Sequence, residues 1–405
     1  MSDATSGRGP WFATVTPSWE KFLSRWGEKI AAGRLTVVFP GGRECHFSGT
    51  QTGPSARICL KNGRPVKRLL CAGALGFAQA YLDGDWDTPD LGVLLELAAV
   101  NEEVWHSLTA GQPVRAAVAY LQHRLRRNSR RGSRRNISFH YDLGNEFYRL
   151  WLDETMTYSS ALFAQDGMSL YDAQQEKYRR ILNELQIGAE DHVLEIGCGW
   201  GGFAEIAARE RGCRVTGLTL SREQAQFARE RLEQAGLGER AEIRLQDYRD
   251  CEGTFSKIVS IEMFEAVGEE NWATYFNQLR TLMAPGGEAL VQTITIAEER
   301  FNRYRSKADF IQAYIFPGGM LPSAAIFDDQ ARAAGLRVTD EYRFGADYDR
   351  TLVHWDQQFR SNRHAIARLG FDDRFLRMWH YYLQYCAVGF RTKRIDVVQF
   401  RLLHA

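Results

Sequence analysis

The chain has 405 residues, enough for two or three domains, and its apolar (44%) and charged (25%) fractions are those of an ordinary globular protein. Its net charge of +1 excludes an overall basic or acidic character. The seven cysteines lack C-x-x-C or metal-ligand spacing, so we expect reduced thiols and no metal site. The N-terminus has no apolar signal core and no apolar run is long enough to span a bilayer. The sequence therefore predicts a cytoplasmic protein whose membrane contact is peripheral.

Residues 1–122 are predicted to form a small α+β domain. Its expected elements after a loose tail are a helix at 19–32, strands at 35–39, 46–47 and 56–60, and helices at 75–82 and 91–100. Turn residues at Pro40-Gly41-Gly42 and Thr52-Gly53-Pro54 separate the strands, which is typical of a short meander.

An arginine-rich run over 123–136 is predicted to be a linker. Its basic members are Arg124, Arg126, Arg127, Arg130, Arg131, Arg134 and Arg135. Their mutual repulsion and the scarcity of apolar residues among them disfavour a packed core. An anionic lipid surface, a nucleic acid and a plain solvated linker are the alternatives. Nucleic acid is the least favoured partner, because no aromatic residues interleave with the arginines and the rest of the chain is neutral.

Residues 137–405 are predicted to form a doubly wound, Rossmann-like α/β domain. Two helices, at 142–152 and 169–186, come first, and Ser169 is the expected N-cap of the second. Strands and helices then alternate at 192–196, 203–211, 213–218, 221–235, 241–245, 257–261, 271–283 and 288–294. Such alternation indicates a largely parallel sheet. An inserted helix and lid loop (304–319), helices at 323–335, 351–369 and 372–389, and a last strand at 396–403 complete the expected elements.

The strand over 192–196 carries the acidic Glu195 near its end and runs into the closely spaced glycines Gly197, Gly199 and Gly201. Glycines let the backbone turn tightly and approach a ligand where a Cβ would collide. A helix-forming stretch follows at once. This arrangement predicts a pocket for a nucleotide-sized cofactor at the carboxyl edge of the sheet.

Two cofactor classes fit a glycine turn of this kind. A nicotinamide or flavin dehydrogenase would place Asp or Glu at the end of the next strand, to bind a ribose hydroxyl. That strand, 213–218, instead runs into Thr219-Leu220-Ser221. We therefore expect S-adenosylmethionine (SAM), whose amino-acid end needs backbone polar contacts and no pyrophosphate cradle.

The second domain also resembles a known family, the cyclopropane-fatty-acyl-phospholipid synthases and their mycolic-acid relatives. The motifs that carry the resemblance, in family order, are His140–Asn145, Thr157–Ser160, Glu195–Gly201, Gly217–Gln224, Gln246–Tyr248, Met263–Gly268, Tyr314–Gly319, Gly345–Leu352 and Tyr381–Cys386. The resemblance implies a SAM-dependent C-methyltransferase that acts on acyl chains of membrane phospholipids. It also implies a role of the first domain in docking to lipid.

The resemblance places the cofactor contacts on Tyr158, Ser159, Glu195, Gly197, Gly199, Gly201, Thr219, Leu220, Gln224, Gln246 and Asp247. Asp247 is expected to accept hydrogens from the adenine amino group. Gln224 is expected to bind ribose hydroxyls.

The implied reaction is methyl transfer to a carbon–carbon double bond, followed by loss of a proton. In the family a bound bicarbonate is thought to accept that proton. The positions that hold it fall on Ser160, Glu265, Gln292, Ile294 and Tyr348. Ser160 replaces the usual Cys, and its backbone N–H still suffices. Gln292 replaces a His and Ala266 another His, which weakens the expected anion site.

The family's conserved thiol falls on Cys386, which is either catalytic or an inert buried cysteine. The altered anion site leaves two products open: a cyclopropane ring, or a ring-free methyl- or methylene-branched chain such as a furan-fatty-acid precursor. A methyltransferase that acts on nucleic acid is a distant third alternative. A homo-oligomer is also left open.

Overall fold

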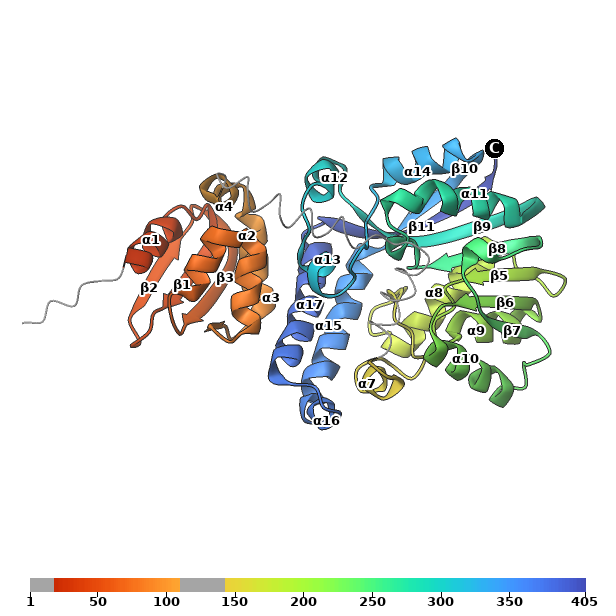
Figure 1. The fold of residues 1–405 in the computed structure, drawn as a ribbon, viewed down its shortest axis with the longest axis horizontal. Coiled ribbons are helices and arrows are strands. Elements are labelled where there is room, and N and C mark those ends of the chain that lie inside the picture. Colours follow the sequence, from red (N-terminus) through yellow and green to blue (C-terminus); the bar gives the residue numbers. More distant parts are fainter. Residues whose placement is uncertain (1–17, 110–142) are drawn as a thin grey trace, which may run out of the picture. The chain divides into compact units, whose positions relative to one another are not determined.

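The structure is a computed structural model that describes residues 18–109 and 143–405. The chain divides into two compact units, on either side of residue 110 (Figure 1). The domain boundary predicted at 123–136, the arginine run and the first residues of the His140–Asn145 motif lie outside the described residues. The functions assigned to the two units and to the linker therefore stay predictions.

The first unit is built on a four-stranded sheet in the order β2-β1-β3-β4. Its strands are β1 (Ala32–Val38), β2 (Glu44–Ser48), β3 (Gln51–Leu60) and β4 (Trp86–Asp87), and its helices are α1 (Ser18–Gly27), α2 (Arg64–Leu82), α3 (Leu91–Val100) and α4 (Glu102–Thr109). The predicted meander is only partly right, because β1 pairs antiparallel with β2 but parallel with β3. The buried Asn101 side chain joins α3 to β1, since it accepts from the N–H groups of Ala31 and Ala32 and donates to Leu97 O.

The second unit is built on a seven-stranded sheet in the order β10-β11-β9-β8-β5-β6-β7. Its strands are β5 (His192–Ile196), β6 (Arg214–Thr219), β7 (Ala241–Leu245), β8 (Phe255–Ile261), β9 (Met283–Ile296), β10 (Leu336–Arg343) and β11 (Ile395–His404). The strands from β7 to β9 pair in parallel, and β11 pairs antiparallel with both β9 and β10. This mixed sheet confirms the doubly wound α/β class that the alternating pattern predicts.

Helices cover both faces of this sheet (Figure 1). Helices α8 (Leu170–Glu184), α9 (Gly202–Arg211) and α10 (Arg222–Gln234) pack on one face, and α11 (Trp272–Leu282) and α14 (Ala324–Ala333) pack on the other. The unit also contains α7 (Asn145–Arg149), α12 (Glu298–Arg305), α13 (Phe310–Tyr314), α15 (Gly345–Ser361), α16 (Arg363–Arg368) and α17 (Asp373–Arg391). Three short 3-10 helices are η1 (Tyr248–Asp250), η2 (Phe264–Ala266) and η3 (Glu269–Asn271). Ser169 caps α8 by accepting from the N–H of Asp172, as predicted.

The sheet separates two apolar clusters because successive side chains of a strand point to opposite faces. On β5, Val193 packs in the cluster with α8, α9 and α10, and Leu194 packs in the cluster with α11 and α14. Both side chains are fully buried. A strand that buries both faces is mostly apolar, and Val193, Leu194 and Ile196 make 192–196 recognisable as a parallel strand from the sequence.

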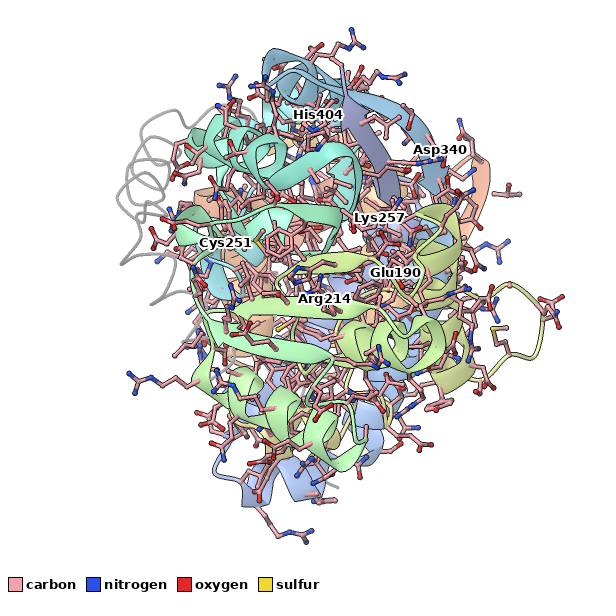
Figure 2. The ribbon with its side chains drawn as sticks, turned by 90° about the vertical axis from the view of Figure 1, so that its right-hand side faces the viewer. Glu190, Arg214, Cys251, Lys257, Asp340 and His404 are labelled. Atoms are coloured by element: carbon pink, nitrogen blue, oxygen red, sulfur yellow. The ribbon has the colours of Figure 1, made fainter. Side chains whose placement is uncertain are left out.

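The edge of this sheet that carries the amino ends of the parallel strands bears charged residues, of which Glu190, Arg214 and Lys257 are labelled in Figure 2. The predicted site residues follow the opposite, carboxyl ends. None of the helices in the described part of the chain is long and apolar enough to cross a membrane.

Candidate functional site

Sheet pairing brings the predicted cofactor segments to one edge. Glu195 and Ile196 pair with Gly217 and Leu218 of β6, and Thr219 pairs with Leu245 of β7. Parallel strands end together, so the loops after β5, β6 and β7 lie side by side.

The loop after β5 has the backbone that the glycines were expected to supply. Gly197, Gly199 and Gly201 have φ values of +85°, +51° and +79°, in the left-handed region that favours glycine. A Cβ on Gly197 would lie 2.8 Å from Cγ of Met263, whereas a Cβ on Gly199 would have no atom within 4 Å. The turn is therefore crowded on the protein side at Gly197 and open at Gly199, as a ligand-binding turn requires.

Glu195 gives this turn an unsatisfied acceptor. The residue is 3% exposed, and its Oε2 atom is buried with no hydrogen-bond partner among the described residues. Burial raises the pKa of Glu195 well above its usual value, and the charge of Lys177 opposes this rise. A buried carboxylate with one oxygen that lacks a donor is suited to the ammonium group of an amino-acid ligand.

Lys177 of α8 was not predicted as a site residue. It is fully buried and donates to Oγ of Ser159 at 2.6 Å and to Oε1 of Gln174 at 2.8 Å. Burial lowers its pKa to about 7, and the nearby carboxylates of Glu262, Asp153 and Glu195 oppose this shift. A lysine in a polar helix is ordinarily solvated, so the sequence carried no signal for its burial.

Thr219 and Gln224 lie together after β6. The Thr219 hydroxyl donates to Oε1 of Gln224 at 2.9 Å, and both residues are buried. This bond leaves the Nε2 group of Gln224 as the donor side of the amide, in keeping with the predicted contact to ribose oxygens. Leu220 forms the half-buried bend between them.

Gln246 and Asp247 follow β7, and the N–H of Gln246 donates to Thr219 O at 3.1 Å. The carboxylate of Asp247 is bound by its neighbour Arg249, with distances of 2.9 Å from Nε to Oδ1 and 2.6 Å from Nη2 to Oδ2. An adenine amino group would share this carboxylate with Arg249. The adenine contact of Asp247 stays a prediction.

An aromatic cluster lies beside the loop that carries Tyr158. The Tyr158 ring has its centroid 5.6 Å from Tyr148, 5.4 Å from Trp151 and 5.4 Å from Trp355. Its hydroxyl and that of Tyr382 share a hydrogen bond of 2.7 Å. Trp151 and Trp355 are fully buried. We call these five residues the aromatic cluster; its ring faces can stabilise positive charge.

The residues expected to hold bicarbonate bind a side chain instead. Glu262, directly after β8, accepts from the N–H of Ser160 (2.8 Å to Oε1), from Nε2 of Gln292 (2.8 Å to Oε1) and from the hydroxyl of Tyr348 (2.5 Å to Oε2). Gln399 donates to Oε1 of Gln292 at 3.0 Å, which fixes the orientation of that amide. Sequence reasoning missed Glu262, because it precedes the Met263–Gly268 motif and has the position of an ordinary strand-end residue.

The other two expected bicarbonate ligands bind each other. The N–H of Ile294 donates to Oε1 of Glu265 at 2.5 Å, and Oε2 of Glu265 is buried without a hydrogen-bond partner among the described residues. Burial and then the charge of Glu262 raise the pKa of Glu265 to about 8. Burial also raises the pKa of Glu262, but Tyr348, Ser160, Lys177 and Gln292 lower it. Burial thus raises the pKa of both carboxyls, and Glu262 is the one whose rise is opposed by the nearby donors and by the charge of Lys177.

Cys386 lies on α17, where burial and then Asp309 raise the pKa of its thiol far above the usual value. The thiol stays protonated, which supports the inert alternative.

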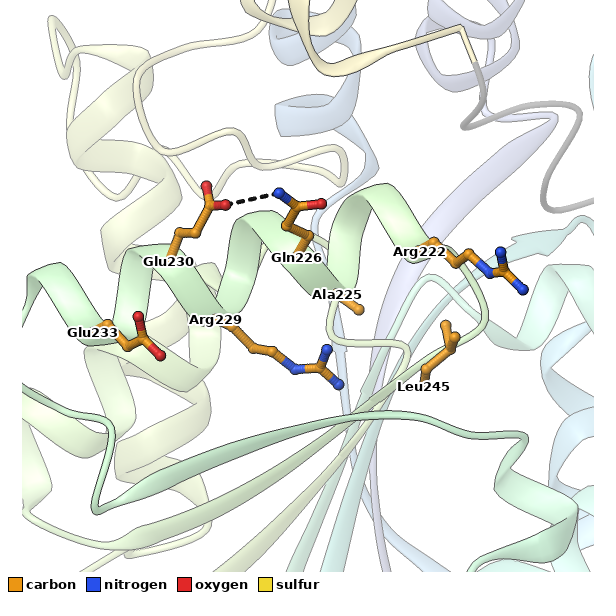
Figure 3. A pocket seen from close by; sticks show the side chains of 7 residues that line it. All are labelled: Arg222, Ala225, Gln226, Arg229, Glu230, Glu233 and Leu245. Carbon is orange, nitrogen blue, oxygen red and sulfur yellow. Dashed lines mark hydrogen bonds between the residues drawn. The ribbon is translucent and has the colours of Figure 1, made fainter.

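A separate depression along α10 is lined by Arg222, Ala225, Gln226, Arg229, Glu230, Glu233 and Leu245 (Figure 3). These side chains include none of the predicted site residues.

The fold, together with the residues at the carboxyl ends of β5, β6 and β7, is that of a SAM-dependent methyltransferase. The family described as mycolic acid cyclopropane synthetase matches residues 128–400. Tuberculostearic acid methyltransferase UfaA1 of Mycobacterium tuberculosis is 41% identical over 350 residues, 84% of this chain and 81% of that protein. The cyclopropane-fatty-acyl-phospholipid synthase of Escherichia coli K12 is 36% identical over 85% of this chain and 87% of its own length.

A solved structure of mycolic acid cyclopropane synthase CmaA1, complexed with SAH and CTAB, is 32% identical and superposes with a TM-score of 0.63, covering 66% of this chain and 97% of that one. The chain belongs to the mycolic acid cyclopropane synthetase family and is a SAM-dependent fatty acid methyltransferase.

Proposed function

We propose that the protein transfers a methyl group from SAM to a double bond in an unsaturated acyl chain of a membrane phospholipid. When bound, SAM supplies an electrophilic methyl group on a sulfonium. Glu195, the glycine turn, Thr219 and Gln224 are the residues that would hold it. The orphaned Oε2 of Glu195 and the open side of Gly199 fit its amino-acid end.

The observation that carries this proposal is that three consecutive residues contact three different parts of the site. Tyr158 belongs to the aromatic cluster, Ser159 binds Lys177, whose charge acts on Glu195, and the N–H of Ser160 binds Glu262. One loop thus joins the residues expected to hold the cofactor, the aromatic rings and the carboxylate of Glu262. An alkene is a poor nucleophile, so its methylation depends on positioning in a dry pocket and on groups that stabilise a carbocation.

We further propose that the product is a ring-free branched chain. Ring closure and ring-free proton loss differ in which proton is removed, so the position of the proton acceptor decides between them. The donors expected to hold a mobile ion bind the side chain of Glu262, and this changes where an acceptor can sit. The 41% identical relative is named a methyltransferase, and the cyclopropane synthase of Escherichia coli is 36% identical.

The experiment supplies the purified full chain with SAM that carries a 13C-labelled methyl group and with vesicles of monounsaturated phosphatidylglycerol. We expect the label in the acyl chains, with an olefinic signal retained in the proton NMR spectrum. Loss of that signal with new ring protons would make the product a cyclopropane. Unlabelled lipid in the presence of bound SAM would refute the lipid assignment, and label in added RNA would favour the nucleic-acid alternative.

A further inference from the structure

The donors around Glu262 do not fit a bound bicarbonate. Three of the five expected ligands, from Ser160, Gln292 and Tyr348, already bind the Glu262 carboxylate, and the remaining two bind each other. A bicarbonate ion at this place would have to compete with the Glu262 carboxylate for the same three donors. It would also lie beside a like charge in a buried place, which is unfavourable.

The backbone at Glu262 supports a selected role for its side chain. Its φ is +50°, a conformation that glycine adopts freely and that is unfavourable for other residues. The strand pairing holds this geometry, since the N–H of Glu262 donates to Gln292 O at 2.8 Å. A carboxylate placed on a backbone that favours glycine, and met by three donors, indicates that the side chain is needed there.

We propose that Glu262 is the built-in anion of this site, and that its carboxylate replaces an exchangeable bicarbonate as the proton acceptor. The inference rests on the proposed function. Once the alkene has taken the methyl group, a neighbouring carbon is cationic. A carboxylate oxygen of Glu262 takes a proton from a carbon bonded to the cationic one. The electron pair of that C–H bond becomes a double bond, and the proton passes on to solvent, so no oxidant or reductant is needed.

Two substitutions test this assignment. Glu262→Gly removes the carboxylate, relaxes the backbone and leaves room for a small anion. Glu262→Gln keeps the shape of the side chain but removes its charge and the oxygen that accepts the proton. The matched control is Lys393→Gly. Lys393 is an exposed residue before β11 with φ of +55°, so its replacement relaxes the backbone in the same way at a distance from the site.

In buffer freed of carbon dioxide, we expect wild-type and Lys393→Gly proteins to keep full turnover. Glu262→Gly should lose at least tenfold and regain activity with millimolar bicarbonate or formate, whereas Glu262→Gln should be inactive with either anion. Bicarbonate should raise the melting temperature of Glu262→Gly alone, a readout that needs no turnover.

Three results would overturn the proposal: bicarbonate-dependent turnover or bicarbonate stabilisation of the wild type, full turnover of Glu262→Gly without an added anion, or no response of that variant to bicarbonate in either assay. If Glu262→Gly fails to fold, the wild-type measurements still decide. Failure of the proposed function is distinguishable, because lipid would then stay unmethylated by the wild type while the melting-temperature response is unaffected.

Discussion

The hydrogen bond from Tyr348 to Glu262 is, of the contacts that oppose burial, the one that lowers the pKa of Glu262 most. The titratable or charged groups that face Glu262 are Tyr348 on α15, Lys177 on α8 and Glu265 in η2, and the other two partners, Ser160 and Gln292, are neutral. If Glu262 must be ionised to accept a proton, turnover rises with pH through its pKa. The position of that acidic limb therefore reports on Tyr348.

Tyr348→Phe should move the acidic limb of the pH profile of kcat upward by about one pH unit, because loss of the donor raises the pKa of Glu262. The measurement is kcat against pH with SAM saturating. Tyr171→Phe, at an exposed tyrosine of α8, is the control and should leave the profile in place. An unmoved limb in Tyr348→Phe would argue that another group sets it.

Glu195→Gln should weaken SAM binding by about tenfold, because it replaces a charge-assisted acceptor with a neutral one. Calorimetric titration measures the change, and Glu210→Gln, on the surface of α9, serves as the control. The unpartnered Oε2 atom makes this a direct test of the cofactor contact. Equal affinities in the two variants would remove Glu195 from the contact set.

At the residue scale, the sequence predicted that the candidate cofactor segments share one edge of the sheet, but it did not predict the partners of the candidate acid–base residues. Glu195, the glycines and Thr219 follow from strand ends and turn chemistry, which are local. Glu262 and Lys177 depend on long-range contacts: the donors to Glu262 come from the loop at 160, from β9 and from α15. The residues that neighbour Glu262 and Lys177 in the sequence do not indicate which groups these two side chains bind.

At the scale of elements, the alternating strands and helices from β5 to α11 could be predicted because buried parallel strands are apolar. Strand β10 was not predicted, because it lies at the edge of the sheet and most of its residues are exposed and polar. Strand β9 (Met283–Ile296) begins five residues before the strand predicted at 288–294 and takes up Met283, the last residue of the helix predicted at 271–283. The helix expected at 304–314 is two helices, because Asp309 forms a capping box with Gln312 and starts α13 anew.

The glycine turn gives a prediction that belongs to this scale. Gly197→Ala should lower the free energy of unfolding by about 1–3 kcal/mol and abolish SAM binding, because the new Cβ strains the backbone and meets Met263. Gly286→Ala is the matched control, with φ of +73° and no atom within 4 Å of its Cβ. Urea unfolding and calorimetry compare the two. A Gly197→Ala protein that binds SAM normally would mean that the turn does not shape the pocket.

At the scale of the whole molecule, the arginine run predicts a membrane-docking role that the described residues do not test. Replacing its seven arginines with serine should weaken binding to phosphatidylglycerol vesicles, because each basic residue contributes about 1 kcal/mol near an anionic surface. Vesicle sedimentation measures this, and SAM affinity should be unchanged. Undiminished vesicle binding would leave the run as a plain linker.

The fold class and the family could be predicted from the sequence of residues 137–405 alone. The role of the first unit cannot be inferred in the same way, because its small sheet carries no predicted site residue.

The central claim is that this site alkylates acyl-chain double bonds. Its most direct test is mass spectrometry of phospholipid acyl chains from cells that produce the wild-type protein, the Glu262→Gln variant or neither. We predict unsaturated chains heavier by one CH2 with the wild type alone, while purified Glu262→Gln still binds SAM. Acyl chains of identical mass in all three cultures, with folded SAM-binding protein present, would contradict the account.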